Sequence, residues 1–209
     1  MTGSRPRSMP PSTFGAASIS MIQSREDLNR YLEADRIGLR RTGMRPSPYD
    51  EVWRFQRLLR RVEFLHNSGA NGMVRRYWGW RLHRQSVRCG FEIPLNTFGP
   101  GLSIAHRGTI IVHPDARIGA NCRIHVDVVI GTRPGPPPEP APRIGDNCYI
   151  GPGAKIFGDV ILGPNLVVGA NSVVNKSFPE GRMTIAGAPA RKISETPSDA
   201  YIIATRTNG

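Results

Sequence analysis

Aliphatic residues recur at every sixth position through the middle of the chain. Twelve positions carry this pattern, with one step of eight and one longer interruption: Phe98, Ile104, Val112, Ile118, Ile124, Ile130, Ile144, Ile150, Ile156, Leu162, Val168 and Val174. Neither an amphipathic helix nor a two-sided strand has a period of six. A parallel β-helix does, because each short strand sends one aliphatic side chain inward before the chain turns a corner. With three corners per turn, the twelve positions predict four coils.

Three segments before the repeat show the spacing of amphipathic helices. The first begins near Ser24, whose Ser-Arg-Glu-Asp context is typical of a helix start, and the others run from Tyr49 to about residue 65 and over 73–87. In the second segment arginines fill the face opposite the apolar one. The third is rich in large residues (Tyr77, Trp78, Trp80 and Leu82), and a unit this small cannot bury so much aromatic surface alone. We therefore expect it to pack on the β-helix or on a neighbouring subunit.

The composition divides the chain into four parts. Residues 1–20 are rich in serine and proline and predict a disordered tail, and residues 21–90 form a small helical domain. Residues 91–178 form the β-helix, interrupted by a proline-rich loop at 131–143 that cannot pair as a strand. Residues 179–209 are a C-terminal extension, whose last fifteen residues we expect to fray. The predicted fold class is mostly β, with an N-terminal helical domain.

The formal net charge of +12 comes largely from the helical domain, which carries fifteen arginines against seven acidic residues. Such an excess favours anionic partners, namely nucleic acid, a phosphorylated cofactor or an anionic membrane surface, although a solvated helix face explains it equally well. No nucleic-acid-binding motif accompanies the arginines, so we expect no nucleic-acid partner. No apolar run of eighteen residues is present, so we expect no membrane span.

The three cysteines form no CxxC motif and no even framework, which favours a reducing, cytoplasmic compartment. Cys122 and Cys148 each end the pattern Ile-Gly-x-Asn-Cys, which places them at equivalent points of two coils. The pattern indicates small packing residues, and a catalytic thiol is the less favoured interpretation.

Three features together resemble the hexapeptide-repeat acyltransferases. These are the run of hexapeptides, the Ile-Ala-His-Arg-Gly bulge at 104–108, and the closing Gly-Ala-Pro-Ala-Arg-Lys at 187–192. Within that superfamily the chain resembles the serine O-acetyltransferase-like group, which includes polysaccharide and sugar O-acetyltransferases. The resemblance implies a left-handed β-helix, acetyl-CoA as the donor, and a homotrimer or a dimer of trimers. It also implies active sites in the grooves between neighbouring subunits.

His106 is the predicted catalytic base. Acyl transfer to a hydroxyl needs a group that takes the acceptor proton near neutral pH and returns it to the leaving thiolate, and histidine suits this role. Its place, two residues after Ile104 on the short bulge, matches the catalytic histidine of the family; the alternative is an exposed surface histidine. Glu92 is the nearest counterpart of the acid that orients this histidine in the family. That match needs a one-residue gap and a change from aspartate to glutamate.

His113 and His125 each follow an anchor of the repeat directly, where other coils have glycine. Either could touch the substrate, but we favour partly exposed corner residues. Their spacing lacks the His-x4-His pattern of zinc sites between β-helix subunits, so no metal is expected.

The resemblance also assigns a donor site. It places Gly151 and Gly153 along the pantetheine arm, Ala170 as a backbone hydrogen-bond partner, and Lys176 and Arg191 at the phosphates. The geometry of the coil alone also explains the two glycines.

Two residues bear on the identity of the acceptor. Where serine acetyltransferases place an aspartate and a second histidine, this sequence has Ala105 and Ala141. The leading hypothesis is therefore acetyl transfer to a hydroxyl of a sugar or polysaccharide precursor, with the 132–142 segment as one wall of the site. One alternative is a serine O-acetyltransferase of cysteine biosynthesis. The other is a non-catalytic β-helix scaffold with a basic, anion-binding helical domain.

Overall fold

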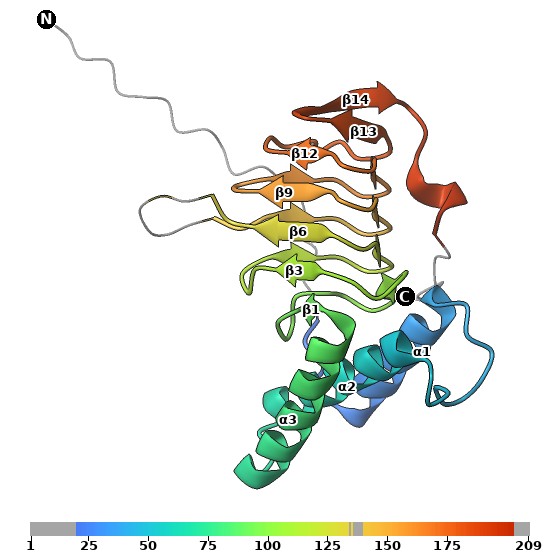
Figure 1. Ribbon diagram of the computed structural model, residues 1–209, viewed down its shortest axis with the longest axis vertical. Coiled ribbons are helices and arrows are strands. Elements are labelled where there is room, and N and C mark those ends of the chain that lie inside the picture. The colour runs from blue at the N-terminus through green and yellow to red at the C-terminus, as the bar shows by residue number, and fades with distance from the viewer. Residues whose placement is uncertain (1–19, 134, 136–139, 203–209) are drawn as a thin grey trace, which may run out of the picture.

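A computed structural model describes residues 20–133, 135 and 140–202 of the chain. Three helices form the base, and a stack of short parallel strands rises from them (Figure 1). The expected disordered tail lies outside the described residues except for Ser20, as do parts of the proline-rich loop and the last seven residues.

The helices occupy the three predicted segments: α1 (Arg25–Gly38), α2 (Glu51–Asn67) and α3 (Gly72–Cys89). Ser24 begins α1 with a capping box. Its hydroxyl accepts a hydrogen bond from the Asp27 backbone amide, and the Asp27 carboxylate accepts one from the Ser24 backbone amide. Gly90 ends α3 in the left-handed conformation, which glycine adopts without steric cost. None of the described helices is long and apolar enough to cross a bilayer.

The strands are short, and most contain two or three residues. They are β1 (Phe91–Glu92), β2 (Ser103–Ile104), β3 (Ile110–Val112), β4 (Arg117–Ile118), β5 (Arg123–Ile124), β6 (Val128–Gly131), β7 (Arg143–Ile144), β8 (Tyr149–Ile150), β9 (Lys155–Phe157), β10 (Ile161–Leu162), β11 (Val167–Val168), β12 (Val173–Val174), β13 (Thr184–Gly187) and β14 (Ala190–Ser194).

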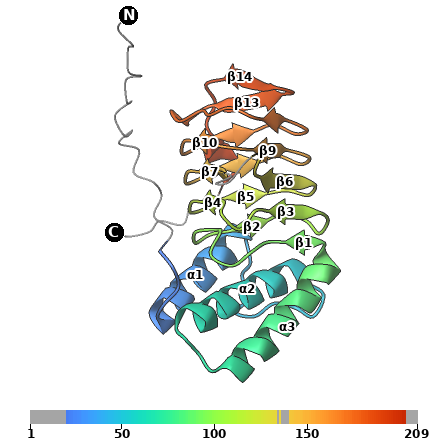
Figure 2. The same cartoon turned by 90° about the vertical axis from the view of Figure 1, so that its left-hand side faces the viewer.

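These strands build the three walls of a prism. Sheet A has the order β1-β3-β6-β9-β12, sheet B is β4-β7-β10, and sheet C is β2-β5-β8-β11-β13-β14. All pairs are parallel except β13 with β14. In sheet C, Ile124 pairs with Ile104 below it and with Ile150 above it. Successive anchors of the repeat therefore enter successive sheets, and the prediction of three corners per coil is confirmed (Figure 2).

The anchors form the core of the prism. All twelve are at most 2% exposed. Burying one such side chain contributes about 1.5–3 kcal/mol, so the twelve anchors together strongly favour coiling. Cys122 and Cys148 are fully buried among them, and burial raises the pKa of the Cys148 thiol to about 12. Both cysteines are packing residues, as predicted.

Asparagines shape many of the corners. Asn121, Asn147 and Asn165 occupy the same turn of successive coils, between sheets B and C, with φ values of 55–57°. Asparagine tolerates this left-handed conformation better than other non-glycine residues. The side-chain amide nitrogen of Asn121 also donates to Oδ1 of Asn147 at 2.9 Å, which links two coils.

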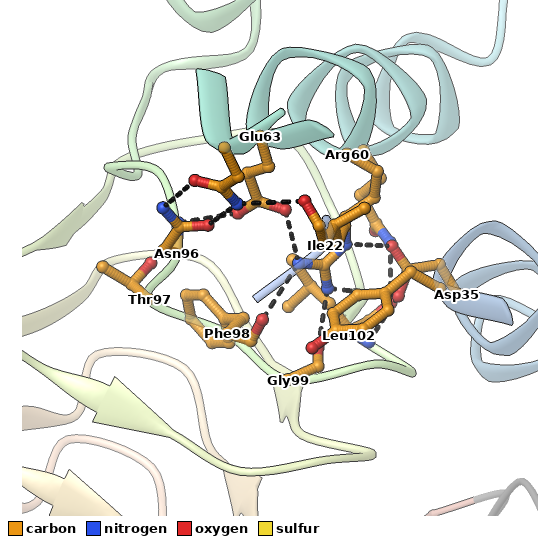
Figure 3. A network of polar contacts seen from close by, with 12 residues as sticks. Ile22, Asp35, Arg60, Glu63, Asn96, Thr97, Phe98, Gly99 and Leu102 are labelled. Atoms are coloured by element: carbon orange, nitrogen blue, oxygen red, sulfur yellow. Dashed lines mark hydrogen bonds and ion pairs between the residues drawn. The ribbon is translucent and has the colours of Figure 1, made fainter. Parts of the chain in front are cut away.

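A buried ion-pair network joins the helices to the first coil (Figure 3). Arg60 of α2 is fully buried and pairs with Asp35 of α1 at 2.9 Å and with Glu63 at 3.0 Å. The same guanidinium donates to the carbonyl oxygens of Phe98 and Gly99. The position of the coil relative to α1 and α2 is therefore fixed by charge-assisted hydrogen bonds.

The large residues of α3 are only partly covered within one chain. Leu82 is buried and Trp78 packs against the core, whereas Tyr77 and Trp80 are 53% and 54% exposed, with Arg84 stacked 5.0 Å over the Trp80 ring. Packing of the exposed rings on a neighbouring subunit stays a prediction. The expected fraying is wrong for the segment after β14, which ends in the 3-10 helix η1 (Ser198–Ala200). Ser198 is buried there, and its amide donates to Asn165 O at 3.2 Å. This segment therefore lies along sheet C.

Candidate active site

One edge of the prism, where sheet C turns into sheet A, gathers most of the predicted site residues; we call it the C–A edge. The strands of sheet C are in register, so the residues that follow each strand stack upon one another. The Ala105 amide donates to Ile124 O at 3.0 Å, and the His125 amide donates to Ile150 O at 3.2 Å. His106 and His125 consequently lie in neighbouring coils of the same edge.

His106 is exposed on a bulge between β2 and β3 that the helical base supports. The Gly108 amide donates to Cys89 O at the end of α3, at 2.9 Å, and the Arg107 guanidinium pairs with the Glu51 carboxylate of α2. The His106 ring centroid lies 6.2 Å from that of His125. The backbone of the bulge is thus anchored to the helices, and the imidazole it carries is open to a substrate.

His125 is packed between two aromatic rings. Its centroid lies 5.0 Å from the ring of Tyr149 as well as 6.2 Å from that of His106. Its Nε2 atom is buried and has no hydrogen-bond partner among the described residues. Burial, with Arg123 and His106 nearby, lowers the pKa of His125 to about 4, so this ring is neutral at neutral pH. A buried polar atom without a partner is costly and indicates a site for a ligand or a water molecule.

His113 lies on a different edge, where sheet A turns into sheet B; we call it the A–B edge. Its Nδ1 accepts from the Asp115 amide at 3.2 Å within a local turn. The described ends of the proline-rich loop, Gly131 and Arg143, lie on this same edge. Within one chain, therefore, neither His113 nor the ends of this loop lie beside His106.

Glu92 lies in β1, where it pairs in register with Ile111 of sheet A and is exposed. In the part of the chain that the structure describes, no hydrogen bond or ion pair joins it to His106. Its role as the orienting acid stays a prediction.

Four of the five predicted donor-site residues follow the C–A edge away from the helices. Gly151, Gly153 and Ala170 belong to turns that leave sheet C, and Arg191 of β14 pairs with Ala186 at the far end of the edge. Lys176 lies instead on the A–B edge, with Nζ 5.7 Å from the ring of Phe178. One chain therefore does not bring both predicted phosphate ligands to a single edge.

The coil itself requires the two donor-site glycines. A Cβ atom at Gly151 would come within 2.8 Å of the Val168 carbonyl oxygen, and Gly153 has a φ of +74°. Both residues are needed whether or not a ligand binds, so their presence alone is no evidence for a pantetheine site.

A pocket of about 430 Å³ opens beside the histidines, between the outer face of sheet C, the end of α1 and η1. Its lining includes Arg40, Ala105, Arg123, His125, Tyr149 and Tyr201. Sequence reasoning missed four of these, namely Arg40, Arg123, Tyr149 and Tyr201. A signal existed for two: Arg123 and Tyr149 directly precede anchors, so their side chains point outward on one wall of the prism.

The arrangement suits proton transfer to and from a hydroxyl. The exposed imidazole of His106 lies between the pocket and a column of small residues, which are Gly151, Gly153 and Ala170. An extended molecule can lie along this column. Among the described residues, no group of three or more His, Cys, Asp or Glu side chains could hold a metal ion.

Comparison with known proteins agrees with this architecture. The family model described as "Bacterial transferase hexapeptide (six repeats)" matches residues 141–176. A serine acetyltransferase of Synechococcus elongatus is 31% identical over 112 residues, which is 53% of this chain and 46% of the relative. That of Staphylococcus xylosus is 35% identical over 107 residues, 51% of this chain and 49% of the relative. The chain thus aligns with about half the length of these curated relatives.

Solved structures show the same fold. Serine acetyltransferase from Neisseria gonorrhoeae superposes with a TM-score of 0.65 at 23% identity, covering 82% of this chain and 68% of that one. The enzyme from Brucella abortus strain S19 in complex with coenzyme A gives a TM-score of 0.62 at 26% identity, covering 81% and 67%.

The hexapeptide repeat, the three-walled coil and the similar solved structures together define the fold. It is a left-handed parallel β-helix with an N-terminal helical region. The chain carries the hexapeptide repeat of bacterial transferases over residues 141–176, and the relatives and solved structures to which it is similar are serine acetyltransferases.

Proposed function

We propose that the protein is an acetyl-CoA-dependent O-acetyltransferase with His106 as its general base. The observation that carries this proposal is the exposed imidazole of His106 on the C–A edge, beside a pocket on one side and the column of small residues on the other. The serine acetyltransferases to which the chain is similar support the reaction class, and the Brucella abortus structure with coenzyme A supports the donor.

In this reaction His106 acts twice. Its neutral imidazole accepts the proton of the acceptor hydroxyl while the oxygen attacks the thioester carbonyl carbon. When the tetrahedral intermediate collapses and the C–S bond breaks, the imidazolium returns that proton to the sulfur, so the products are the acetyl ester and the free thiol. We propose that Glu92 orients the imidazole and stabilises its charged form.

The donor lies along the upper part of the C–A edge in this proposal. The pantetheine arm follows Gly151 and Gly153, and the backbone of Ala170, which is exposed, offers a hydrogen bond to its amides. Arg191 and Lys176 bind phosphate groups. Since these two cations occupy different edges of one chain, both reach one donor only if neighbouring chains share a site. This supports the homotrimer that the family resemblance implies.

The acceptor has two candidates. The names of the similar proteins support L-serine, the alternative hypothesis, better than the sugar that we expected first. A sugar hydroxyl stays the second candidate because Ala105, where the serine enzymes carry an aspartate, lines the pocket and offers no partner for an ammonium group. Within one chain, Ala141 supports neither candidate acceptor, since it lies near β7 on the A–B edge.

The experiment is an acetyl-CoA assay that follows the free thiol with L-serine, glucose or UDP-glucose as separate acceptors. Saturable thiol release that needs one of these acceptors and disappears in His106→Ala supports the proposal, and the acceptor with the highest kcat/KM decides between the candidates. Slow thiol release at the same rate with and without an acceptor would favour the non-catalytic scaffold.

A further inference from the structure

The pocket beside the histidines carries a charge that the chain itself does not neutralise. Arg40 follows the end of α1, and Arg123 projects from sheet C, and both line the pocket. Neither forms an ion pair with a carboxylate among the described residues, and no described Asp or Glu lines the pocket. The neighbouring Arg41, in contrast, is paired with Asp50 at 2.7 Å.

The two guanidinium groups are close enough to disfavour one another. Burial lowers the pKa of Arg123, and the charge of Arg40 lowers it further. The Arg123 side chain is held in place by a 2.8 Å hydrogen bond to the Ser103 hydroxyl. Two neighbouring cations of this kind are stabilised when an anion binds between them.

The rest of the pocket suits a ring. Tyr149 and Tyr201 are in contact, with ring centroids 5.1 Å apart and planes tilted by 43°, and Tyr149 continues the row to His125. Carbohydrate and base rings present flat apolar faces that pack on such side chains. The partnerless Nε2 of His125 is available to a hydroxyl of the same ligand. A volume of about 430 Å³ lies within the ~300–1,000 Å³ typical of sites that bury a ligand larger than an amino acid.

We propose that this pocket binds the acceptor as an anion, with a phosphate or carboxylate between Arg40 and Arg123, and with the reacting hydroxyl at His106. This inference rests on the proposed function, because it names the acceptor class of the same site. The row of tyrosine rings and the volume favour a phosphorylated sugar over free serine, whose carboxylate alone would use the arginines.

The donor does not account for these arginines. Gly151, Ala170 and Arg191 follow the C–A edge away from the helices, whereas Arg40 lies at the helical base of the coil. The pocket lies on the outer face of sheet C, whereas the proposed donor residues lie in the turns of the C–A edge, so the two ligands reach His106 from different sides.

The test measures binding by calorimetry without acetyl-CoA, so that its outcome does not depend on turnover. The probes are glucose 1-phosphate, UDP-glucose, glucose and L-serine, and the variants are Arg40→Gln, Arg123→Gln and Arg123→Lys. The matched control is Arg143→Gln, since Arg143 is an exposed arginine just before an anchor of sheet B. We expect a phosphorylated probe to bind, each glutamine variant to weaken its binding about tenfold, and Arg123→Lys to recover part of it.

Equal binding of glucose and glucose 1-phosphate, or Arg123→Gln matching the Arg143→Gln control, would overturn the anion site. Binding of L-serine alone, weakened by the glutamine variants, would uphold the anion site and overturn the sugar. Weaker binding of CoA in Arg40→Gln and Arg123→Gln would reassign the pocket to the donor. If the phosphorylated probe binds as expected but no acetyl transfer occurs, the proposed function fails while the site stands.

Discussion

At the scale of single residues, the sequence predicted the base more readily than its surroundings. His106 could be singled out because it interrupts a regular repeat on a short bulge. Arg123 and Tyr149 sit in regular hexapeptides, and their common wall becomes visible only when the register between coils is known. Arg40 lies just after α1 and Tyr201 near the end of the described residues. No local pattern connects segments so far apart in the sequence. His125 was predicted as a corner residue, and its contact with His106 depends on the same register.

The environment of His125 predicts a pH-dependent stability. Its folded-state pKa is about 4, below the ordinary value of 6.5, mainly because of burial. Between these pH values the unfolded state binds the proton and the folded state does not, so the free energy of unfolding falls as the pH drops from 6.5 towards 4. We expect His125→Asn to lose less stability than the wild type between pH 7.5 and pH 5.

Urea unfolding of both proteins at the two pH values measures this difference. The pH 7.5 values serve as the reference, because the histidine is neutral there in both states. Equal losses of stability in the two proteins would show that the His125 ring is not shielded from protonation.

At the scale of secondary-structure elements, the helix pattern predicted the position of α2 but not the role of its polar face. Arginines opposite an apolar face are usually solvated, yet Arg60 is completely buried. Burial by itself would lower the pKa of Arg60, but the carboxylates of Asp35 and Glu63 raise it above its ordinary value. Burial raises the pKa of Glu63 despite that pairing. A pattern of apolar spacing cannot reveal such a network, because all the partners of Arg60 except Glu63 come from α1 and from the first coil.

Replacing Arg60 by leucine should destabilise the protein strongly. The substitution leaves Asp35 and Glu63 buried without their cation, and breaking a buried pair in this way costs about 3–5 kcal/mol. Arg30→Leu is the matched control, since Arg30 pairs with Asp27 of the same helix at 3.0 Å while partly exposed. Such surface pairs contribute about 0–1 kcal/mol. Similar midpoints of urea unfolding for the two variants would mean that the Arg60 network does not hold the helices on the coil.

At the scale of the whole molecule, the period of six predicted the prism and its three corners, because one buried aliphatic residue per wall is a strong and repetitive constraint. It could not predict which corner faces a ligand. That depends on where the chain enters the coil and on the lengths of the bulge at 105–109 and of the proline-rich loop. The family resemblance grouped Lys176 with Arg191, and the structure separates them onto two edges of one chain.

That separation predicts a shared site. If a homotrimer joins the A–B edge of one chain to the C–A edge of the next, the sedimentation mass should be three times the 23.0 kDa of one chain. Arg191→Ala and Lys176→Ala should each raise the KM for acetyl-CoA several-fold, since each removes one charged contact to phosphate. A monomer in which both substitutions leave the KM unchanged would rule out this arrangement of the donor site.

The most direct test of the central claim is the turnover of His106→Ala with saturating acetyl-CoA and the best acceptor. Loss of a general base predicts a fall in kcat of about 10²-fold or more, with the dissociation constant of CoA unchanged. His66→Ala, which removes an exposed histidine from the last turn of α2, should keep the wild-type rate. Wild-type turnover in a folded His106→Ala protein would contradict the assignment of the base and, with it, the site described at the C–A edge.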